Sequence, residues 1–457
     1  MQVRPLQGVA TTMNDWLDAE QRIERAQQFS ESMRWAEALA EMEAALAINP
    51  HNGTWHAQRG YLLEELERPS EAISAYEYAV ELEPDDRDVT MALGAGLLRL
   101  GRLARAVAIF ERLIESNPDF EPAYCHAIAA YTELGQHEKA EQMFYLAQEI
   151  DERCPHCFFN MGESLAVRGD TDRAIYCWQQ VLDIEPSYMG VNRRIAQAYR
   201  AAGDGELARD FYLNELREDP GSPELLFELA ELALEEEELA TAAARFAHIV
   251  DLHQDHVEAR FALGKIWLHQ GHNDEALGCF EAIEAIDRNP DLPEFDRRVG
   301  EALFKLGRVN EANKRFEKAI ERDGEQEDLM MVYGTSLLAA NRVSSAADSY
   351  RKVLASNAKN GLAHHSLAVC LLKQEKFDLG LEHCRRAIEV NPDSVASRCN
   401  AAYAMMRLGQ WRQARKMLSE ALVVEPSNSL VKGLLKRAWR YRISYAWSRL
   451  LRILRIR

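Results

Sequence analysis

Apolar side chains recur at helical spacing through most of the chain, and short breaks divide them into pairs of helical segments. Residues 87–120 show one such pair. Its first segment carries four apolar residues on one face, namely Val89, Leu93, Leu97 and Leu100. Gly101 interrupts this pattern, and a second apolar run follows and ends at Pro118. A hairpin of two short helices cannot bury its apolar face alone, so we predict that it packs against copies of itself.

Copies of this hairpin occur every 34 residues, over residues 19–256 and again over residues 293–428. A small residue marks one position of every second helix: Ala38, Ala72, Ala106, Ala140, Ala174, Ala208, Ala242, Ala276, Ala312, Ala346, Gly380 and Ala414. The matching position of the first helix is also small, except at Ile128. Small residues such as Gly94 let the two helices approach closely, and a large residue such as Phe110 fills the remaining space.

The turn between the two helices of a unit is usually marked by glycine, which predicts a left-handed backbone there. Asn341 takes this position in one unit and is the usual substitute for glycine. The first two units depart from the rule, because Met33 and Glu67 stand at the turn.

This period and this set of small, aromatic and proline positions resemble the tetratricopeptide repeat family over about nine tenths of the chain. The resemblance implies an all-α, right-handed superhelical solenoid whose first helices line a concave groove. It also implies that partner proteins or peptides bind in that groove. The asparagines and lysines with which some members clamp chaperone peptides are absent here.

The resulting domain prediction is an array of twelve repeats with a segment at each end. Residues 1–18 are expected to be partly disordered, and residues 429–457 to form a cap followed by a basic amphipathic helix. The repeats are predicted at residues 19–52, 53–86, 87–120, 121–154, 155–188, 189–222, 223–256, 257–292, 293–326, 327–360, 361–394 and 395–428. The repeat 257–292 has two extra residues near Asn289, where we expect a loop or a changed twist. No flexible linker is predicted.

Composition and motifs favour a binding protein over an enzyme. The chain has a net charge of −19, no run long enough to span a membrane, and no signal-peptide pattern, so we expect a cytoplasmic protein. We find no phosphate-binding loop, dinucleotide-binding loop, zinc-protease motif or nucleophile elbow, and we predict no catalytic activity and no cofactor. Four of the eight cysteines, Cys177, Cys279, Cys370 and Cys384, fall at core positions.

One group of cysteines carries candidate chemistry. Cys154 and Cys157 form a CxxC motif around a Pro-His pair. In the family that the chain resembles, two groove-facing positions would bring Cys125 near His156, so these four residues are a candidate zinc site. The alternative is that His156 is exposed and the thiols pack between repeats, because a single CxxC lacks the second ligand pair of strong zinc motifs. A thiol-dependent activity is a more remote alternative.

Two sets of first-helix residues are candidates for the partner-binding groove. The polar set could hold a carboxylate or phosphate and consists of Arg193, Arg194, Gln197, Arg200, Arg297 and Arg298. Its alternative is that each arginine pairs with a neighbouring glutamate on a solvated face. The apolar set would suit an amphipathic helix or an extended peptide and includes Met331, Leu338, Tyr403 and Met406. The chain's own C-terminus could instead cover it.

The last 26 residues differ sharply in charge from the rest of the chain. Residues 432–457 contain nine basic residues and no acid, which leaves −28 for the remainder. The predicted helix contacts a partner through Trp439, Arg440, Ile443, Trp447, Arg449, Leu450, Arg452, Leu454 and Arg455. An anionic membrane surface and an acidic protein fit this helix equally, and nucleic acid fits less well because the acidic body repels a polyanion.

The sequence therefore predicts an interaction scaffold that binds partner proteins or peptides in the groove of a repeat superhelix. The alternative is a peripheral-membrane assembly factor tethered by the basic C-terminal helix. A metal- or thiol-dependent protein that uses the Cys154–Cys157 pair is the remote alternative.

Overall fold

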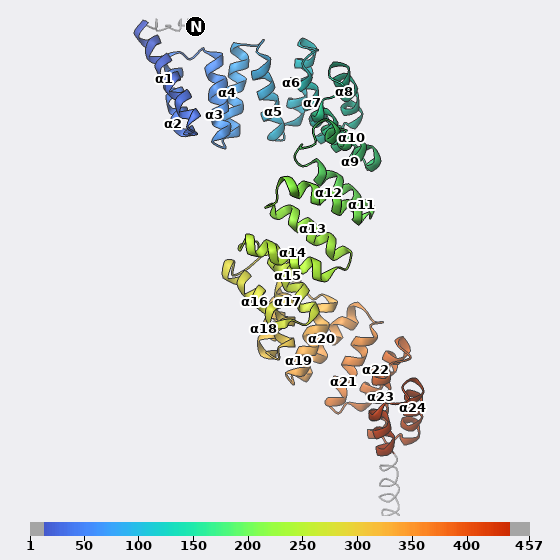
Figure 1. Cartoon of the computed structure of the whole chain (residues 1–457). Helices are drawn as coiled ribbons and strands as arrows, with labels where there is room; N and C mark the ends of the chain where they lie inside the picture. The colour runs from blue at the N-terminus through green and yellow to red at the C-terminus, as the bar shows by residue number, and fades with distance from the viewer. Residues whose placement is uncertain (1–12, 439–457) are drawn as a thin grey trace, which may run out of the picture. The chain divides into compact units, whose positions relative to one another are not determined.

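A computed structural model of the chain describes residues 13–438, and these residues form helices joined by short turns, with no strand among them (Figure 1). The chain divides into two compact units, Met1–Leu225 and Leu226–Arg457, and the boundary falls inside helix α13. The repeat pattern of the sequence predicts one array without a division. We describe each unit by itself.

The first unit contains six helical hairpins and the start of α13. Its helices are α1 Met13–Glu31, α2 Trp35–Ile48, α3 Gly53–Glu65, α4 Pro69–Leu82, α5 Arg87–Arg99, α6 Leu103–Ser116, α7 Glu121–Glu133, α8 His137–Ile150, α9 Pro155–Val167, α10 Thr171–Ile184, α11 Val191–Ala202 and α12 Gly205–Glu218. The two helices of each hairpin contact each other and the next hairpin. One core of buried apolar residues runs from Ile23 to Ile195.

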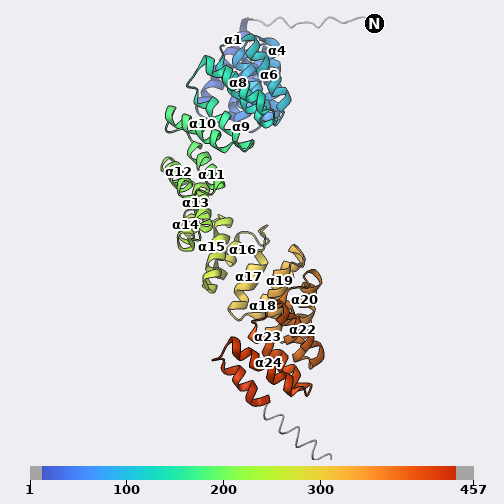
Figure 2. The same cartoon turned by 90° about the vertical axis from the view of Figure 1, so that its right-hand side faces the viewer.

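The second unit continues the same alternation of first and second helices. After α13 Pro223–Glu235 come α14 Leu239–Leu252, α15 Val257–Gln270, α16 Asn273–Ile286, α17 Phe295–Lys305, α18 Val309–Asp323, α19 Glu327–Ala339, α20 Val343–Ser356, α21 Gly361–Lys373, α22 Phe377–Val390, α23 Val395–Arg407 and α24 Trp411–Val424. Figure 2 shows α17 to α24 as successive stacked hairpins. Residues 429–438 are helical, and Val431 and Ala438 are buried in the core beside α23 and α24.

The packing inside a hairpin follows the predicted alternation of small and large side chains. A Cβ atom on Gly94 would lie 2.5 Å from Cε1 of Phe110, so only glycine lets this ring take its place. Phe110 is completely buried. The same relation joins Gly264 to Phe280 and Gly300 to Phe316 in the second unit.

The turn between the two helices takes a left-handed backbone whether or not glycine is present. Gly101 has a φ of 67°, as predicted for a glycine turn, and Asn341 has a φ of 59°. Met33 and Glu67 adopt the same conformation, with φ of 54° and 56°. The geometry of the hairpin therefore requires a left-handed backbone at this position, also in the repeats that have neither glycine nor asparagine there.

One segment differs from the expectations and another agrees with them. Helix α1 begins at Met13, before the predicted start of the first repeat at residue 19, and its residues Trp16 and Leu17 are exposed. The two extra residues near Asn289 lie in a non-helical segment between α16 and α17, which is the predicted loop.

The start of α17, directly after this loop, is held by a buried carboxylate. Asp296 is completely buried, and its Oδ1 lies 3.0 Å from a guanidinium nitrogen of Arg315 and 3.3 Å from Nζ of Lys318. Its Oδ2 lies 3.5 Å from a guanidinium nitrogen of Arg322. All three cations come from α18, so this cluster fixes α17 on α18 where the spacing of the repeats is interrupted.

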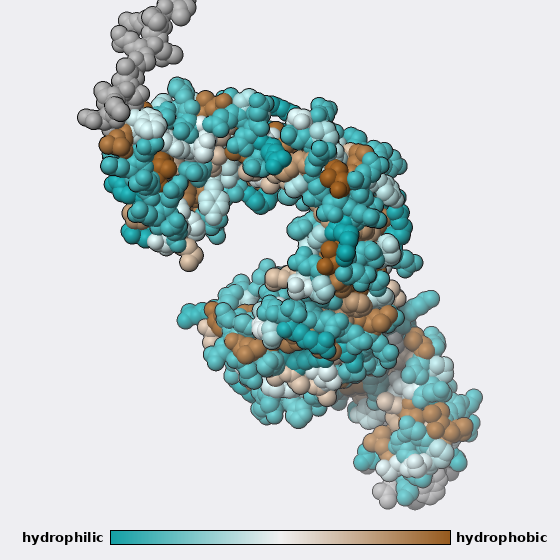
Figure 3. Space-filling model, turned by 45° about the horizontal axis from the view of Figure 1, so that its top comes forward, coloured by the Kyte–Doolittle hydropathy of each residue, from teal (hydrophilic) through white to brown (hydrophobic). Residues whose placement is uncertain are grey.

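Hydrophilic side chains dominate the molecular face shown in Figure 3, and apolar side chains occur there in small scattered groups. Among residues 13–438, none of the helices is both long enough and apolar enough to cross a bilayer.

Candidate metal centre and interaction surfaces

Three cysteines and one glutamate converge where the first helices of two successive repeats begin. Glu121 is the first residue of α7, and Cys125 lies four residues later on the same helix face. Cys154 is the N-cap of α9, and Cys157 lies in its first turn. All three cysteines are buried, and Glu121 is half-buried. We call these four residues the thiol cluster.

The donor atoms of the thiol cluster surround a common point. One carboxylate oxygen of Glu121 lies 2.7 Å from Sγ of Cys125, 2.7 Å from Sγ of Cys154 and 3.0 Å from Sγ of Cys157. Sγ of Cys125 lies 2.7 Å from that of Cys157 and 3.4 Å from that of Cys154. All four donor atoms lie within 4.8 Å of one another.

Local backbone structure holds the two sulfurs of α9 in place. The backbone N–H of Cys157 donates to Sγ of Cys154 at 3.2 Å, as expected for a side chain that caps a helix. Pro155 begins the helix, where its missing N–H leaves no hydrogen bond unmade. The side-chain amide of Asn160 on α9 donates to the backbone carbonyl of Cys125 on α7 at 2.8 Å, which fixes the backbone of Cys125. The helix start also places positive backbone dipoles beside Cys154.

The close approach of these groups perturbs their pKa values. Hydrogen bonds from Cys125 and Cys157 lower the pKa of the Cys154 thiol, while hydrogen bonds with Cys154 and Cys157 raise the pKa of Cys125. Burial raises the pKa of the Glu121 carboxyl. These shifts have opposite directions on neighbouring thiols because the groups share hydrogen bonds with one another.

The structure brings together three of the four residues of the candidate zinc site and replaces the fourth. His156 is exposed, and its ring packs against Tyr188 with centroids 5.3 Å apart. Glu121 takes the place that sequence analysis gave to His156. The spacing of Glu121 and Cys125 was the available signal, because residues four apart on a helix share a face. Together they form the second ligand pair that CxxC alone lacked.

The candidate groove arginines are engaged with acidic groups of the protein. Arg297 and Arg298 both pair with Glu294 and Glu301 on or beside their own helix, at distances of 2.7–3.4 Å. Arg194 pairs with Glu163 at 3.0 Å. The alternative in which arginines pair with neighbouring glutamates therefore describes these three residues. Arg193, Gln197 and Arg200 also interact with other groups of the protein.

The apolar candidates separate into two places. Met331 and Leu338 are partly buried and pack against the core of α19 to α21. Tyr403 and Met406 of α23 instead line a pocket of about 480 Å³ near the end of the described chain. Its other lining residues are Arg407, Trp411, Leu434 and Arg437. We call this the C-terminal pocket.

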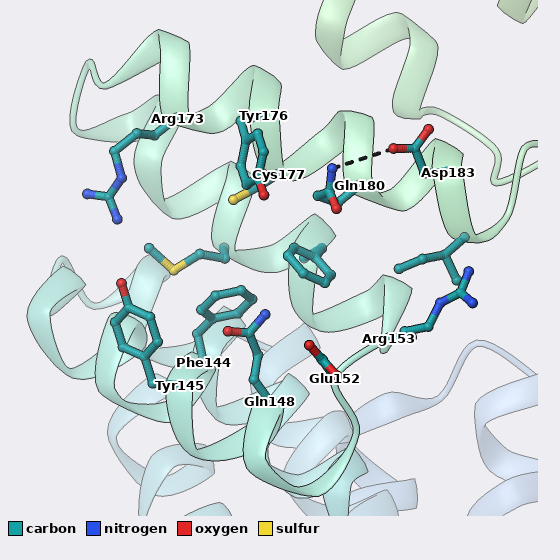
Figure 4. Close-up of a pocket in the computed structure, with 13 residues that line it drawn as sticks. Phe144, Tyr145, Gln148, Glu152, Arg153, Arg173, Tyr176, Cys177, Gln180 and Asp183 are labelled. Carbon is teal, nitrogen blue, oxygen red and sulfur yellow. Dashed lines mark hydrogen bonds between the residues drawn. The ribbon is translucent and has the colours of Figure 1, made fainter.

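A second pocket, of about 560 Å³, lies between the second helices α8 and α10 (Figure 4). Phe144 and Tyr145 of α8 face Tyr176 and Cys177 of α10 across it. The side-chain amide of Gln180 donates to Asp183 at 3.5 Å along its edge. No residue that sequence analysis selected for binding lies among those lining this pocket.

The predicted tail contacts, from Trp439 to Arg455, lie outside the described residues. The structure therefore places only the beginning of the basic segment, up to residue 438. Arg437, in this beginning, belongs to the C-terminal pocket.

Comparison with known proteins identifies the repeat. A tetratricopeptide repeat model matches residues 23–87, 57–119, 91–153, 159–223, 297–360 and 332–395, and a second such model matches residues 233–297 and 371–438. The TPR repeat-containing protein YpiA of Bacillus subtilis (strain 168) is 24% identical over 210 residues, which is 44% of this chain and 49% of YpiA. The antiviral innate immune response effector IFIT1 of Macaca fascicularis is 26% identical over 176 residues, which is 36% of this chain and 31% of IFIT1.

Among solved structures, the APC/C hetero-tetramer Cut9–Hcn1 aligns with 92% of this chain and 96% of its own, at 12% identity and a TM-score of 0.43. The chain matches about half the length of YpiA and about a third of IFIT1. The repeat models match well over half of the chain. The chain therefore belongs to the tetratricopeptide repeat family.

Proposed function

We propose that this protein is an interaction scaffold whose C-terminal pocket binds a partner segment that combines an apolar side chain with acidic residues. Tetratricopeptide repeats present extended surfaces for protein partners, and membership of the family supports the general role of a scaffold. The observation that carries the specific proposal is the lining of the C-terminal pocket. Tyr403 offers a partly exposed ring, Met406 lines the pocket from a buried position, and Arg407 and Arg437 add two positive charges.

The arginines of the pocket differ from those of the candidate groove in how they are engaged. Arg407 donates to the hydroxyl of Tyr403 at 3.1 Å, and its guanidinium lies 4.4 Å from the ring centroid of Phe377. Its nearest acid, Glu375, is 3.7 Å away and highly exposed, so this pair is weak. Arg437 is exposed and has no ion pair within residues 13–438. Both arginines are thus available to a carboxylate of a partner.

Charge also argues against the chain's own C-terminus as the occupant. Residues 439–457, which follow the pocket residue Arg437, contain six basic residues and no acid, so this segment is repelled by the arginines that line the pocket. An acidic partner segment is attracted by both the pocket and the basic residues that follow it. Tyr403 and Met406 lie on a first helix, the helix type that lines the concave groove in this family.

A peptide selection tests this proposal. Random peptides displayed on phage are selected against the immobilised full chain, and a synthetic copy of the enriched sequence is titrated by fluorescence polarisation. We expect enriched peptides to combine aromatic or aliphatic residues with Asp or Glu, and to bind more weakly as salt increases. Tyr403→Ala and Arg437→Glu should each weaken binding about tenfold or more, since loss or reversal of one central contact is worth about 1.4 kcal/mol or more.

The matched control is Arg386→Glu, which reverses an exposed arginine on the second helix α22 of the same unit. It should leave the affinity unchanged. Peptides that lack acids, or that bind equally well to Tyr403→Ala, Arg437→Glu and the native chain, would show that the pocket is not the binding surface.

The basic tail supports a second candidate function, which is attachment to an anionic membrane surface. Its alternation of arginines with tryptophan, leucine and isoleucine favours an interfacial helix, and each basic residue contributes about 1 kcal/mol near an anionic bilayer. Co-sedimentation with vesicles of phosphatidylcholine and phosphatidylserine should fall strongly when residues 441–457 are removed. Equal sedimentation of the two chains would contradict membrane attachment and leave an acidic protein as the partner of the tail.

A further inference from the structure

We propose that Glu121, Cys125, Cys154 and Cys157 bind one Zn²⁺ ion, which joins the repeat 121–154 to the repeat 155–188. This site is independent of the C-terminal pocket and of the proposed partner. It lies wholly within the first unit, at the starts of α7 and α9.

The types of donor atom select the metal. Three thiolates are soft ligands, which exclude Mg²⁺ and Ca²⁺ as the resident ion. Iron–sulfur clusters are usually held by four cysteines, whereas this group offers three cysteines and a carboxylate. Zinc accepts sulfur and carboxylate oxygen together in a four-coordinate site. The cysteine and glutamate pairs also have the arrangement of a zinc site, with two ligands on each of two chain segments.

The distances fit a tetrahedral ion after a small adjustment. Zinc–sulfur bonds of about 2.3 Å place tetrahedral sulfurs about 3.8 Å apart. The sulfur of Cys125 lies 2.7 Å and 3.4 Å from the sulfurs of Cys157 and Cys154. The donor atoms therefore separate by about 1 Å or less, which rotation of the side chains can supply. Binding requires deprotonated thiols, and their protons pass to the solvent.

A disulfide explains the cluster less completely than a metal does. A disulfide would join two of the three sulfurs and leave the third sulfur beside the Glu121 carboxylate, in a buried site. Zinc uses all three sulfurs and the carboxylate oxygen that contacts each of them. The N–H of Cys157 that donates to Cys154 then stabilises a metal-bound thiolate.

The site would have a structural role. With four protein ligands it is closed, as structural zinc sites are, and no position remains for substrate. Its ligands come in pairs from α7 and α9, and these two helices share much more extensive contact than any other pair of first helices among the described residues. A zinc ion here clamps the two helices at their N-terminal ends.

Metal analysis of the full chain tests the proposal directly. The protein is produced with zinc in the medium, purified under reducing conditions and measured by mass spectrometry of its elements. We expect about one zinc per chain, and X-ray absorption should show three sulfurs at about 2.3 Å and one lighter ligand at about 2.0 Å. Cobalt added to the apoprotein should give the intense visible bands of a tetrahedral thiolate site.

Substitutions then identify the ligands. Cys125→Ser and Cys154→Ser should reduce zinc to well below half an ion per chain, and Glu121→Gln should weaken zinc affinity at least tenfold in competition with a chelator. His156→Ala and Cys177→Ser are the matched controls and should keep a full ion. His156→Ala also separates this ligand set from one that includes the histidine.

Stability gives a readout that does not depend on the variants folding. At free zinc about a hundred times its dissociation constant, binding should raise the unfolding midpoint of the first unit by about 5–10 °C, and a strong chelator should reverse this. Native protein with no zinc and no cobalt bands, or zinc that remains in Cys154→Ser but leaves in His156→Ala, would overturn the proposal. So would a disulfide among these cysteines that forms in the reduced, zinc-supplied preparation.

Discussion

Two glycines of helix α5, Gly94 and Gly96, allow the packing of small residues against large side chains to be tested. A Cβ atom on Gly94 of α5 would lie 2.5 Å from Cε1 and 2.8 Å from Cζ of Phe110. A Cβ atom on Gly96, two residues later, would meet its nearest atoms at 3.5 Å, which is ordinary contact. Gly94→Ala and Gly96→Ala therefore gain the same helix propensity, but only Gly94→Ala creates a steric clash.

The expected free energies follow from these distances. Alanine is favoured over glycine inside a helix by about 1 kcal/mol, so Gly96→Ala should stabilise the protein by about 0.5–1 kcal/mol. Gly94→Ala gains the same propensity, but the fully buried ring of Phe110 must move by about 1 Å, and overpacking of this kind costs about 1–3 kcal/mol. Gly94→Ala should thus be less stable than Gly96→Ala by about 1–3 kcal/mol.

Hydrogen exchange in α5 and α6 is the suitable assay, because a repeat array can open locally and a single global midpoint would dilute the effect. Amides of both helices should exchange faster in Gly94→Ala and more slowly in Gly96→Ala. Replacing the ring of Phe110 by the smaller side chain of leucine should relieve the clash. The double variant Gly94→Ala/Phe110→Leu should therefore show a coupling energy of about 1 kcal/mol or more. Equal exchange in the two alanine variants would refute the packing argument.

Three further predictions concern charge, turns and pH. Asp296→Asn removes the negative charge that three cations of α18 surround, so it should destabilise the second unit and lower the urea midpoint. The expected loss is limited to about 2–3 kcal/mol, because these partly exposed cations can regain some hydration. Gly101→Ala should destabilise its hairpin and Glu67→Gly should stabilise its own, each by about 1 kcal/mol in thermal unfolding, since both residues have positive φ and no atom lies within 4 Å of a Cβ on Gly101. Burial lowers the pKa values of His365 and His383, so the unfolded chain takes up protons first as pH falls through about 6.5, and the urea midpoint should decrease from pH 7.5 to 5.5. A midpoint that stays constant or rises over this range would contradict the last prediction.

The period of the sequence predicted the helices because each repeat solves the same packing problem in the same register. Gly94 and Phe110 could be paired from sequence, since the hairpin brings their positions together wherever it occurs. The left-handed turns at Met33 and Glu67 show that the register determines the backbone even where the local residue disfavours it.

The sites were harder to predict because they depend on contacts between repeats and on competition among charges. Glu121 was not selected, since a glutamate in the first turn of a helix is common and is usually explained by the helix dipole. Its role becomes visible only when α7 and α9 are placed side by side. Conversely, Arg298 was selected as a groove residue although Glu294 and Glu301 stand four and three residues away, where a helix brings them within reach.

The repeat 121–154 differs from the other repeats at Ile128 and in the ligands that it supplies to the thiol cluster. Ile128 stands where the other first helices carry a small residue, and it is completely buried. Phe144 of α8 takes the position that Phe110 has opposite Gly94, and α7 and α8 pack against each other as extensively as the helices of other hairpins, so this repeat accommodates the larger residue without separating its two helices. The same repeat supplies Glu121 and Cys125 to the thiol cluster, and its helix α7 makes the most extensive contact between first helices within residues 13–438. A metal ion that binds α7 to α9 would therefore add to a joint that is already well packed. Zinc would stabilise the first unit by an amount set by its affinity, so Ile128→Ala, which opens a cavity in the core, should lower the unfolding midpoint with and without zinc and leave the shift caused by zinc unchanged.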